Sequence, residues 1–111
     1  MPPVEDEKLA ENMRRNLAYL TRRMPAYVRS GTGGQVFGVL SLCRSLYTLR
    51  TGEITVKAPA AQWALGELDP RWRPLVERAV IRYEEGDLSG SDPLLKKEAE
   101  ALAANVREAV D

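Results

Sequence analysis

The segment from Val36 to Lys57, VFGVLSLCRSLYTLRTGEITVK, constrains the fold more than any other part of this chain. It reads as a helix that is apolar on most sides, carries Arg44 and stops at Gly52, followed by a short extended stretch. A helix of this kind is expected to be buried, and burying a lone guanidinium is costly unless an anion or a hydrogen-bond acceptor meets it. We therefore expect Arg44 and Lys57 to bind a negatively charged group.

The apolar periodicity of the remaining chain predicts an all-α fold, a five-helix bundle-like domain that covers residues 1–111. Besides the central helix over about 35–50, helices are expected over about 4–23 and 59–67, from Pro70 to before Gly86, and from Pro93 onward. Pro25 disfavours a helical conformation at the residue before it, so the first helix should end or kink there. Asp69 and Asp92 each precede a proline, the pattern of an N-cap followed by the first helical residue.

The composition of the chain excludes or disfavours several classes of function. Basic and acidic residues balance at 16 each, so binding to nucleic acid in general is disfavoured. No apolar run is long enough to cross a membrane, and the acidic N-terminus lacks the apolar core of an export signal. The single Cys43 is expected to be a reduced, buried thiol, which fits the cytoplasm. The chain contains no histidine, P-loop or Cys-x-x-Cys pair, and therefore shows no complete catalytic set and no metal site.

Three stretches carry a resemblance to a known family: LSLCRSLYTLRTGEITVK at 40–57, APAAQWAL at 58–65 and LDPRWRPLVERAVIRY at 68–83. Together they resemble the helical C-terminal domain of the streptomycin/spectinomycin 3''-adenylyltransferases, aminoglycoside nucleotidyltransferases that modify the drug with AMP. The order and spacing of the motifs match without a gap from Val36 to Tyr83. The first and last helices fit the family's layout only loosely.

The resemblance implies a role for three residues. Arg44, Lys57 and Tyr83 stand at positions where the family's helical domain contacts ATP. Their chemistry suits that role, because the two cations can neutralise phosphate oxygens and the tyrosine can pack against the nucleoside. The family also places an acidic and a polar residue at the start of the central helix, facing the drug. Those positions fall at about Gly34 and Phe37 in this chain.

In the family, a nucleotidyltransferase domain that precedes the helical domain supplies the carboxylates for Mg²⁺ and the catalytic base. We expect that domain to be absent from this chain, which would then use ATP and Mg²⁺ only when completed by such a domain, and would not be catalytic alone. One hypothesis is therefore a helical part of an aminoglycoside adenylyltransferase-like protein that contacts the nucleotide and the aminoglycoside. The alternative is a stand-alone binding or interaction module, as a homodimer or as the partner of a separate nucleotidyltransferase.

Each candidate residue also has a purely structural interpretation. Arg44 could cap carbonyl groups or pair with a carboxylate inside the bundle. Lys57 could be a solvated loop lysine, and Tyr83 an aromatic residue at the edge of the core. Trp63 and Trp72 fall in apolar helical patterns and are expected to be core residues.

Overall fold

A computed structural model of the chain describes residues 3–110, with side chains described for 7–109. Within the described part, five α-helices and one short 3-10 helix follow one another, and no strand occurs, which confirms the all-α prediction. The helices are α1 (Pro3–Arg29), α2 (Thr32–Thr51), α3 (Lys57–Glu67), the 3-10 turn η1 (Pro70–Trp72), α4 (Arg73–Glu85) and α5 (Pro93–Val110).

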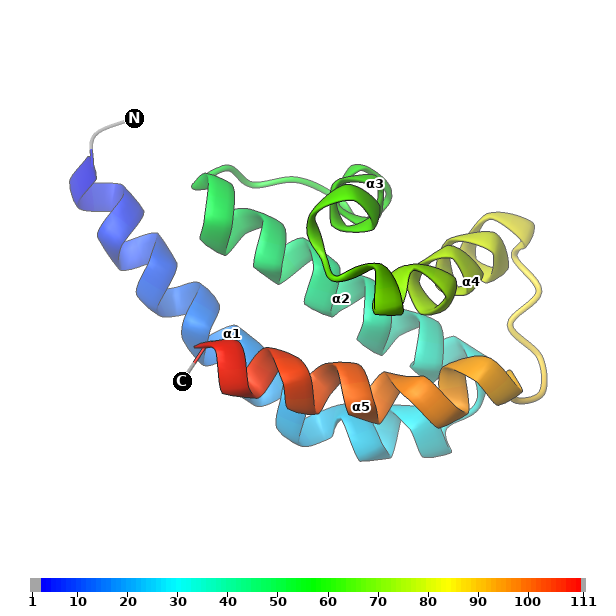
Figure 1. Ribbon diagram of the computed structural model, residues 1–111. Helices are drawn as coiled ribbons and strands as arrows, with labels where there is room; N and C mark the ends of the chain where they lie inside the picture. Colours follow the sequence, from blue (N-terminus) through cyan, green and yellow to red (C-terminus); the bar gives the residue numbers. More distant parts are fainter. Residues whose placement is uncertain (1–2, 111) are drawn as a thin grey trace.

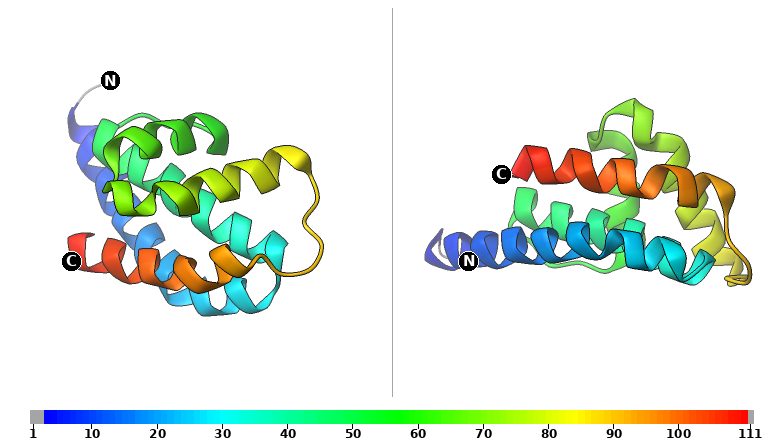
Figure 2. Two further views of the ribbon diagram at one scale, coloured as in Figure 1. Left: turned by 45° about the vertical axis from the view of Figure 1, so that its right-hand side comes forward. Right: turned by 90° about the horizontal axis from the view of Figure 1, so that it is seen from below.

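The second helix is the centre of the fold. It contacts all four other α-helices, with α3 and α4 along one side and α1 and α5 along the other (Figures 1 and 2). Its apolar side chains Val39, Leu42 and Cys43 are completely buried. Gly52 ends α2 in the left-handed conformation with φ of 76°, as a glycine stop predicts. Cys43 is a buried core residue, and this burial raises the pKa of its thiol to about 12, so that little thiolate forms near neutral pH.

The first helix does not end near Arg23, before Pro25, and the predicted end is wrong. Pro25 lies inside α1, which continues to Arg29. The apolar stripe explains the difference, because Leu17, Met24 and Val28 are all buried and continue across the proline. Packing of this stripe on α2 and α5 outweighs the loss of one backbone hydrogen bond at the proline.

Close packing between α1 and α2 depends on two glycines of α2. A Cβ on Gly34 would collide with the carbonyl oxygen of Tyr27, and one on Gly38 would lie 2.6 Å from the sulfur of Met24. The backbones of the two helices therefore approach more closely here than any side chain would permit. Gly33 differs from its neighbour, since the nearest atom to a Cβ there would be Cβ of Leu88 at 3.8 Å.

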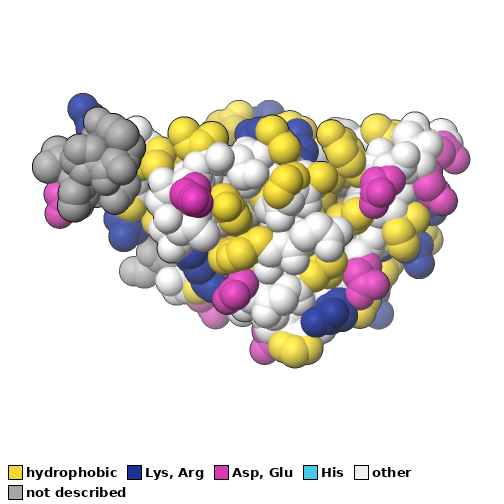
Figure 3. Space-filling view, turned by 90° about the horizontal axis from the view of Figure 1, so that it is seen from above, with side chains coloured by type: hydrophobic (Ala, Val, Ile, Leu, Met, Phe, Trp, Pro, Cys, Tyr) yellow, Lys and Arg dark blue, Asp and Glu magenta, His cyan; other side chains and the backbone are white. Residues whose placement is uncertain are grey.

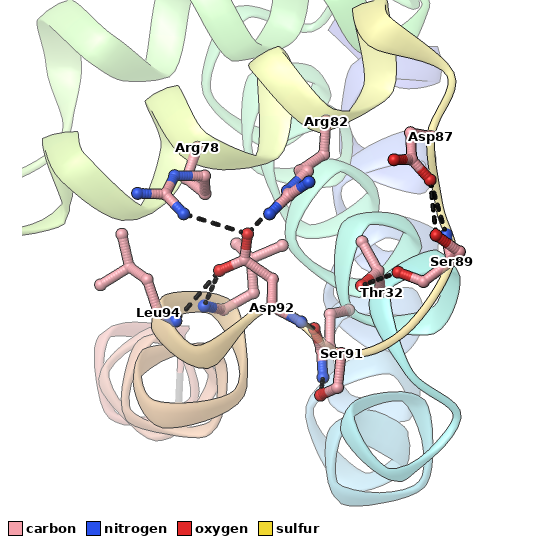
Figure 4. A network of polar contacts seen from close by, with 10 residues as sticks. Thr32, Arg78, Arg82, Asp87, Ser89, Ser91, Asp92 and Leu94 are labelled. Carbon is pink, nitrogen blue, oxygen red and sulfur yellow. Dashed lines mark hydrogen bonds and ion pairs between the residues drawn. The ribbon is translucent and has the colours of Figure 1, made fainter.

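A buried carboxylate fastens the start of α5 to α4. Asp92 is 1% exposed and caps α5 as predicted, with Oδ1 accepting from the backbone N–H groups of Leu94 (3.0 Å) and Leu95 (3.2 Å). Its Oδ2 accepts from Arg82 Nε at 2.8 Å and from Arg78 Nη1 at 3.2 Å (Figure 4). One carboxylate thus satisfies two helix N–H groups and two guanidinium groups.

A buried amide extends this network to α1 and α2. The side chain of Gln35 is inaccessible to solvent, and its Oε1 accepts from the backbone N–H of Asp92 at 3.0 Å. Its Nε2 donates to the carbonyl oxygen of Val28 (3.0 Å) and to Ser91 Oγ (2.8 Å). Gln35 and Asp92 together connect α1, α2, α4 and α5. Every polar group that these two side chains bury finds a hydrogen-bond partner.

Ser41 presents the opposite case, since its buried hydroxyl finds no hydrogen-bond partner in the described part of the chain. We expect Ser41→Ala to raise the free energy of unfolding by about 1 kcal/mol, because a buried unsatisfied hydroxyl is removed. Urea denaturation would measure the change. Ser45→Ala is the matched control: Ser45 Oγ accepts from Asn16 Nδ2 at 2.6 Å, so this variant should be destabilised. A destabilised Ser41→Ala variant would contradict the assignment.

Candidate functional site

Two of the three predicted site residues line one pocket. Lys57 begins α3 and Tyr83 lies near the end of α4, and both border a hollow of about 240 Å³ beside the start of α2. The other lining residues are Gly33, Val36, Phe37, Leu40 and Leu88. The Lys57 ammonium lies 4.9 Å from the centroid of the Phe37 ring, within the range of a cation–π contact. We call this hollow the Phe37 pocket.

The Arg44 side chain is exposed, and the prediction that Arg44 is buried with its apolar helix is wrong. The neighbours of α2 leave one narrow strip of it open, on which Phe37, Arg44 and Thr51 follow one another at intervals of seven residues. This open strip lets the guanidinium reach water, so the expected cost of burying it does not arise. Among the side chains described in residues 7–109, Arg44 forms no ion pair. The pairing inside the bundle considered above is therefore not seen there.

Arg44 borders a second hollow, of about 200 Å³, where the N-terminal end of α1 diverges from α2 (Figure 1). Side chains of α1, α2 and the segment 53–56 line it: Leu9, Met13, Asn16, Arg44, Ser45, Thr48, Ile54 and Thr55. The structure thus places Arg44 outside the Phe37 pocket. Arg44 lies seven positions after Phe37 on the open strip, which corresponds to about 10 Å along the helix axis.

Exposed apolar side chains surround these two hollows. Ile54 is 81% exposed and Val56 is 65% exposed on the extended segment between α2 and α3, and Phe37, Tyr83 and Leu88 are each more than two-fifths exposed. Figure 3 shows one face of the molecule, on which hydrophobic side chains are spread among charged ones of both signs. Exposed large apolar residues in such a concentration are typical of a surface that meets another molecule.

Phe37 and Leu88 are the site residues that sequence reasoning missed as pocket walls. The resemblance gives Phe37 only as the place of a polar residue that faces the drug in the family, and Leu88 lies in the loop before α5. The exposed aromatic ring on an otherwise buried helix is visible only once the helix neighbours are placed. Trp72 is buried and Trp63 packs edge-on against Tyr47 with ring centroids 5.6 Å apart, which confirms both tryptophans as structural residues.

None of the helices in residues 3–110 combines the length and apolar character that crossing a bilayer demands. Nor do three or more of the described Cys, Asp and Glu side chains gather in a way that could hold a metal ion.

Comparison with known proteins assigns the chain to a protein family. Residues 1–109 match the family model described as the aminoglycoside adenylyltransferase, C-terminal domain. The chain is also 34% identical over 88 residues to a spectinomycin 9-adenylyltransferase of Campylobacter jejuni, and the match covers 79% of this chain and 34% of that protein. It therefore spans about a third of the length of the relative. No solved structure matches the chain. The chain belongs to the family of aminoglycoside adenylyltransferase C-terminal domains.

Proposed function

We propose that this chain is the nucleotide-contacting helical part of an aminoglycoside adenylyltransferase-like protein. In this proposal Lys57 and Tyr83 meet the nucleotide at the Phe37 pocket, and Arg44 meets it from the open strip of α2. The observation that carries the proposal is the shared position of Lys57 and Tyr83 on one pocket, although 26 positions separate them in the chain. Both cations of the set have solvent on at least one side, so incoming phosphate oxygens can reach them.

The reaction would require a second domain. Nucleotidyl transfer uses carboxylates to hold Mg²⁺, and the described residues offer no cluster of that kind. The described residues therefore do not fit the metal. The cleft would be completed by a nucleotidyltransferase domain, for which the exposed Ile54 and Val56 provide an apolar contact surface.

Calorimetric titration of the folded chain with ATP and Mg²⁺ tests the proposal. We expect Arg44→Ala and Lys57→Ala each to weaken binding about tenfold, because each removes a charge-assisted contact. Arg50→Ala is the matched control, since Arg50 is an exposed arginine of α2 outside the Phe37 pocket and the open strip. It should change the affinity by less than about twofold. Absence of heat with the wild-type chain would reject nucleotide contact, and AMP transfer to streptomycin by the pure chain would contradict its dependence on a second domain.

The exposed apolar segment also supports a second candidate, a stand-alone module that pairs with another copy of itself. Two neighbouring β-branched residues that face solvent, Ile54 and Val56, are the observation that favours it. Sedimentation of the wild type and of an Ile54→Ser variant distinguishes the two candidates. A dimer that dissociates in the variant would favour the module, whereas a monomer in both leaves the surface available for another domain.

A further inference from the structure

Lys57 is a partly buried cation at the wall of the Phe37 pocket. Among the side chains described in residues 7–109, it forms no ion pair. It is also the first residue of α3, where the positive end of the helix dipole disfavours a cation, and the first turn of this helix contains no acidic residue. The position of the ammonium at the pocket therefore needs another source of attraction.

The ring of Phe37 supplies this attraction. The Lys57 ammonium lies over the ring, 4.9 Å from its centroid, and the electron-rich face of an aromatic ring attracts a cation at this distance. Phe37 is 43% exposed, so water reaches the contact and moderates its strength. The contact uses no hydrogen-bond acceptor, and the three N–H donors of Nζ therefore remain available to an anion that enters the pocket.

The Phe37 ring is itself held by a residue of α1. Tyr27 packs edge-on against Phe37, with ring centroids 5.1 Å apart and ring planes at 75°. A side chain at Gly38 would disturb this pair, because a Cβ there would lie 3.3 Å from Cδ2 of Tyr27 and closer still to Met24. A series of contacts thus runs from Tyr27 on α1 through Phe37 on α2 to Lys57 on α3, the three helices labelled in Figure 1.

From these contacts we infer that Phe37 is a positioning residue, which holds the Lys57 ammonium at the pocket wall where a phosphate can meet it. The inference rests on the proposed function, in which Lys57 contacts the nucleotide, and it adds the residue that prepares Lys57 for this contact. A lysine side chain loses much rotational freedom when it is fixed in one place. Because the ring restrains the ammonium before the nucleotide arrives, less of this entropy is lost on binding and the affinity is higher.

The composition of the chain permits a direct test, since Phe37 is its only phenylalanine. Producing the chain with phenylalanine that carries one, two or three ring fluorines therefore changes this ring alone. Fluorine withdraws electrons from the ring face and weakens its attraction for a cation, while the shape of the ring changes little. We expect the affinity for ATP and Mg²⁺, measured by calorimetry, to fall stepwise with the number of fluorines, by about threefold in total.

The same series in a Lys57→Ala chain distinguishes positioning from a purely structural role. If the ring acts through the ammonium, fluorination should leave the remaining ATP affinity of the Lys57→Ala chain unchanged, because the group that the ring holds has been removed. An equal stepwise loss in both chains would mean that the ring acts on the fold or on the nucleotide directly, and the inference would then be wrong.

NMR of the lysine side chains reports the contact without any ligand. The chain contains four lysines, so a spectrum of the chain with carbon-13 in its lysines has few signals. The ring current of Phe37 should move the CεH2 signal of Lys57 away from those of the other lysines, and Phe37→Leu should return it to them. Circular dichroism checks that this variant is folded. A Lys57 signal that is the same with and without the ring would overturn the inference.

Two further comparisons serve as controls. Tyr27→Leu should weaken the ring-current shift of Lys57, whereas Tyr27→Phe keeps the aromatic pair and should preserve the shift. Tyr19→Leu is the matched control, because it removes another exposed ring with a cation beside it, Arg23 at 5.9 Å from the ring centroid, outside the pocket. It should leave the Lys57 signal in place and change the ATP affinity by less than about twofold.

The two measurements separate this inference from the proposed function. A Lys57 signal that depends on the ring, in a chain that does not bind ATP, would refute the nucleotide proposal and leave the contact established. ATP binding that depends on Arg44 and Lys57 but is insensitive to the fluorines would refute the positioning role of Phe37 alone.

Discussion

Replacing Asp92 with alanine is expected to lower the free energy of unfolding by about 3 kcal/mol. The substitution removes the N-cap of α5 and the common partner of Arg78 and Arg82 at once. The guanidinium groups are partly exposed, with 41% and 30% of their side-chain surfaces accessible, so water can solvate them in the variant. For that reason the expected loss lies at the lower end of the range for a broken buried ion pair. Urea denaturation monitored by circular dichroism would measure it.

Two further variants separate the contributions of the Asp92 carboxylate. Asp92→Asn keeps an oxygen that can cap α5 but removes the negative charge, so its loss should be smaller than that of the alanine variant. Asp69→Ala is the matched control, since Asp69 Oδ1 accepts only the backbone N–H of Arg71 at 2.9 Å and is exposed. It should cost about 1 kcal/mol. Equal losses at the two aspartates would contradict a special role for the buried one.

The same carboxylate makes stability depend on acid pH. Burial alone raises the pKa of Asp92, but hydrogen bonds from Arg82, from the Leu95 N–H and from Arg78 outweigh burial and hold the pKa below its ordinary value. A carboxyl with a lowered pKa stabilises the fold fully above the pKa of the unfolded chain, about 3.9, and this contribution is lost as the pH falls through the folded pKa. The stability difference between wild type and Asp92→Asn should therefore be constant from pH 7 to about pH 5 and shrink below pH 4.

The second large effect is expected at two neighbouring glycines that differ only in the space around them. Gly34→Ala should lower the free energy of unfolding by about 3 kcal/mol, because the new methyl group collides with the backbone of Tyr27, which cannot rotate away. Gly33→Ala should instead raise it by about 0.5 kcal/mol, since alanine favours the helix and meets only Leu88 Cβ at 3.8 Å. Thermal unfolding of the two variants would show shifts of opposite sign.

The comparison is sharp because both variants add the same single methyl group to the same turn of α2. A small effect of Gly34→Ala would mean that α1 and α2 can move apart near Gly34 without a loss of stability. The close approach of the two helices would then not contribute to the free energy of unfolding. A second alanine variant at Gly38 would extend the test along α2. Its Cβ would meet the flexible side chain of Met24, so a smaller loss than at Gly34 is expected.

Local chemistry made the helix ends predictable. The N-caps at Asp69 and Asp92 and the left-handed stop at Gly52 depend on residues within one turn of each position, and all three occur as expected. The predicted starts of α2 and α3 are less accurate. The structure begins α2 at Thr32 and α3 at Lys57, each a few residues earlier than predicted. Neither start has a side-chain cap that the sequence could reveal.

The two wrong predictions concern features that only tertiary packing decides. Pro25 is tolerated inside α1 because the buried stripe on either side of it packs against two other helices. Arg44 is exposed because the neighbours of α2 leave one strip of this helix uncovered. The sequence does not reveal this strip, since α2 is apolar around most of its circumference. Likewise, Lys57 and Tyr83 could be nominated from a family motif, but their meeting with Phe37 at one pocket depends on how α3 and α4 are placed.

The buried thiol of Cys43 makes the chain convenient for site-specific labelling. Because its pKa is raised to about 12, almost no thiolate exists at neutral pH, and a maleimide reagent will leave this cysteine unmodified in the folded chain. A cysteine introduced at the exposed Thr51 can therefore carry a fluorophore without prior removal of the native one. Such a dye would sit beyond Arg44 on the same strip of helix and report directly when another molecule covers it.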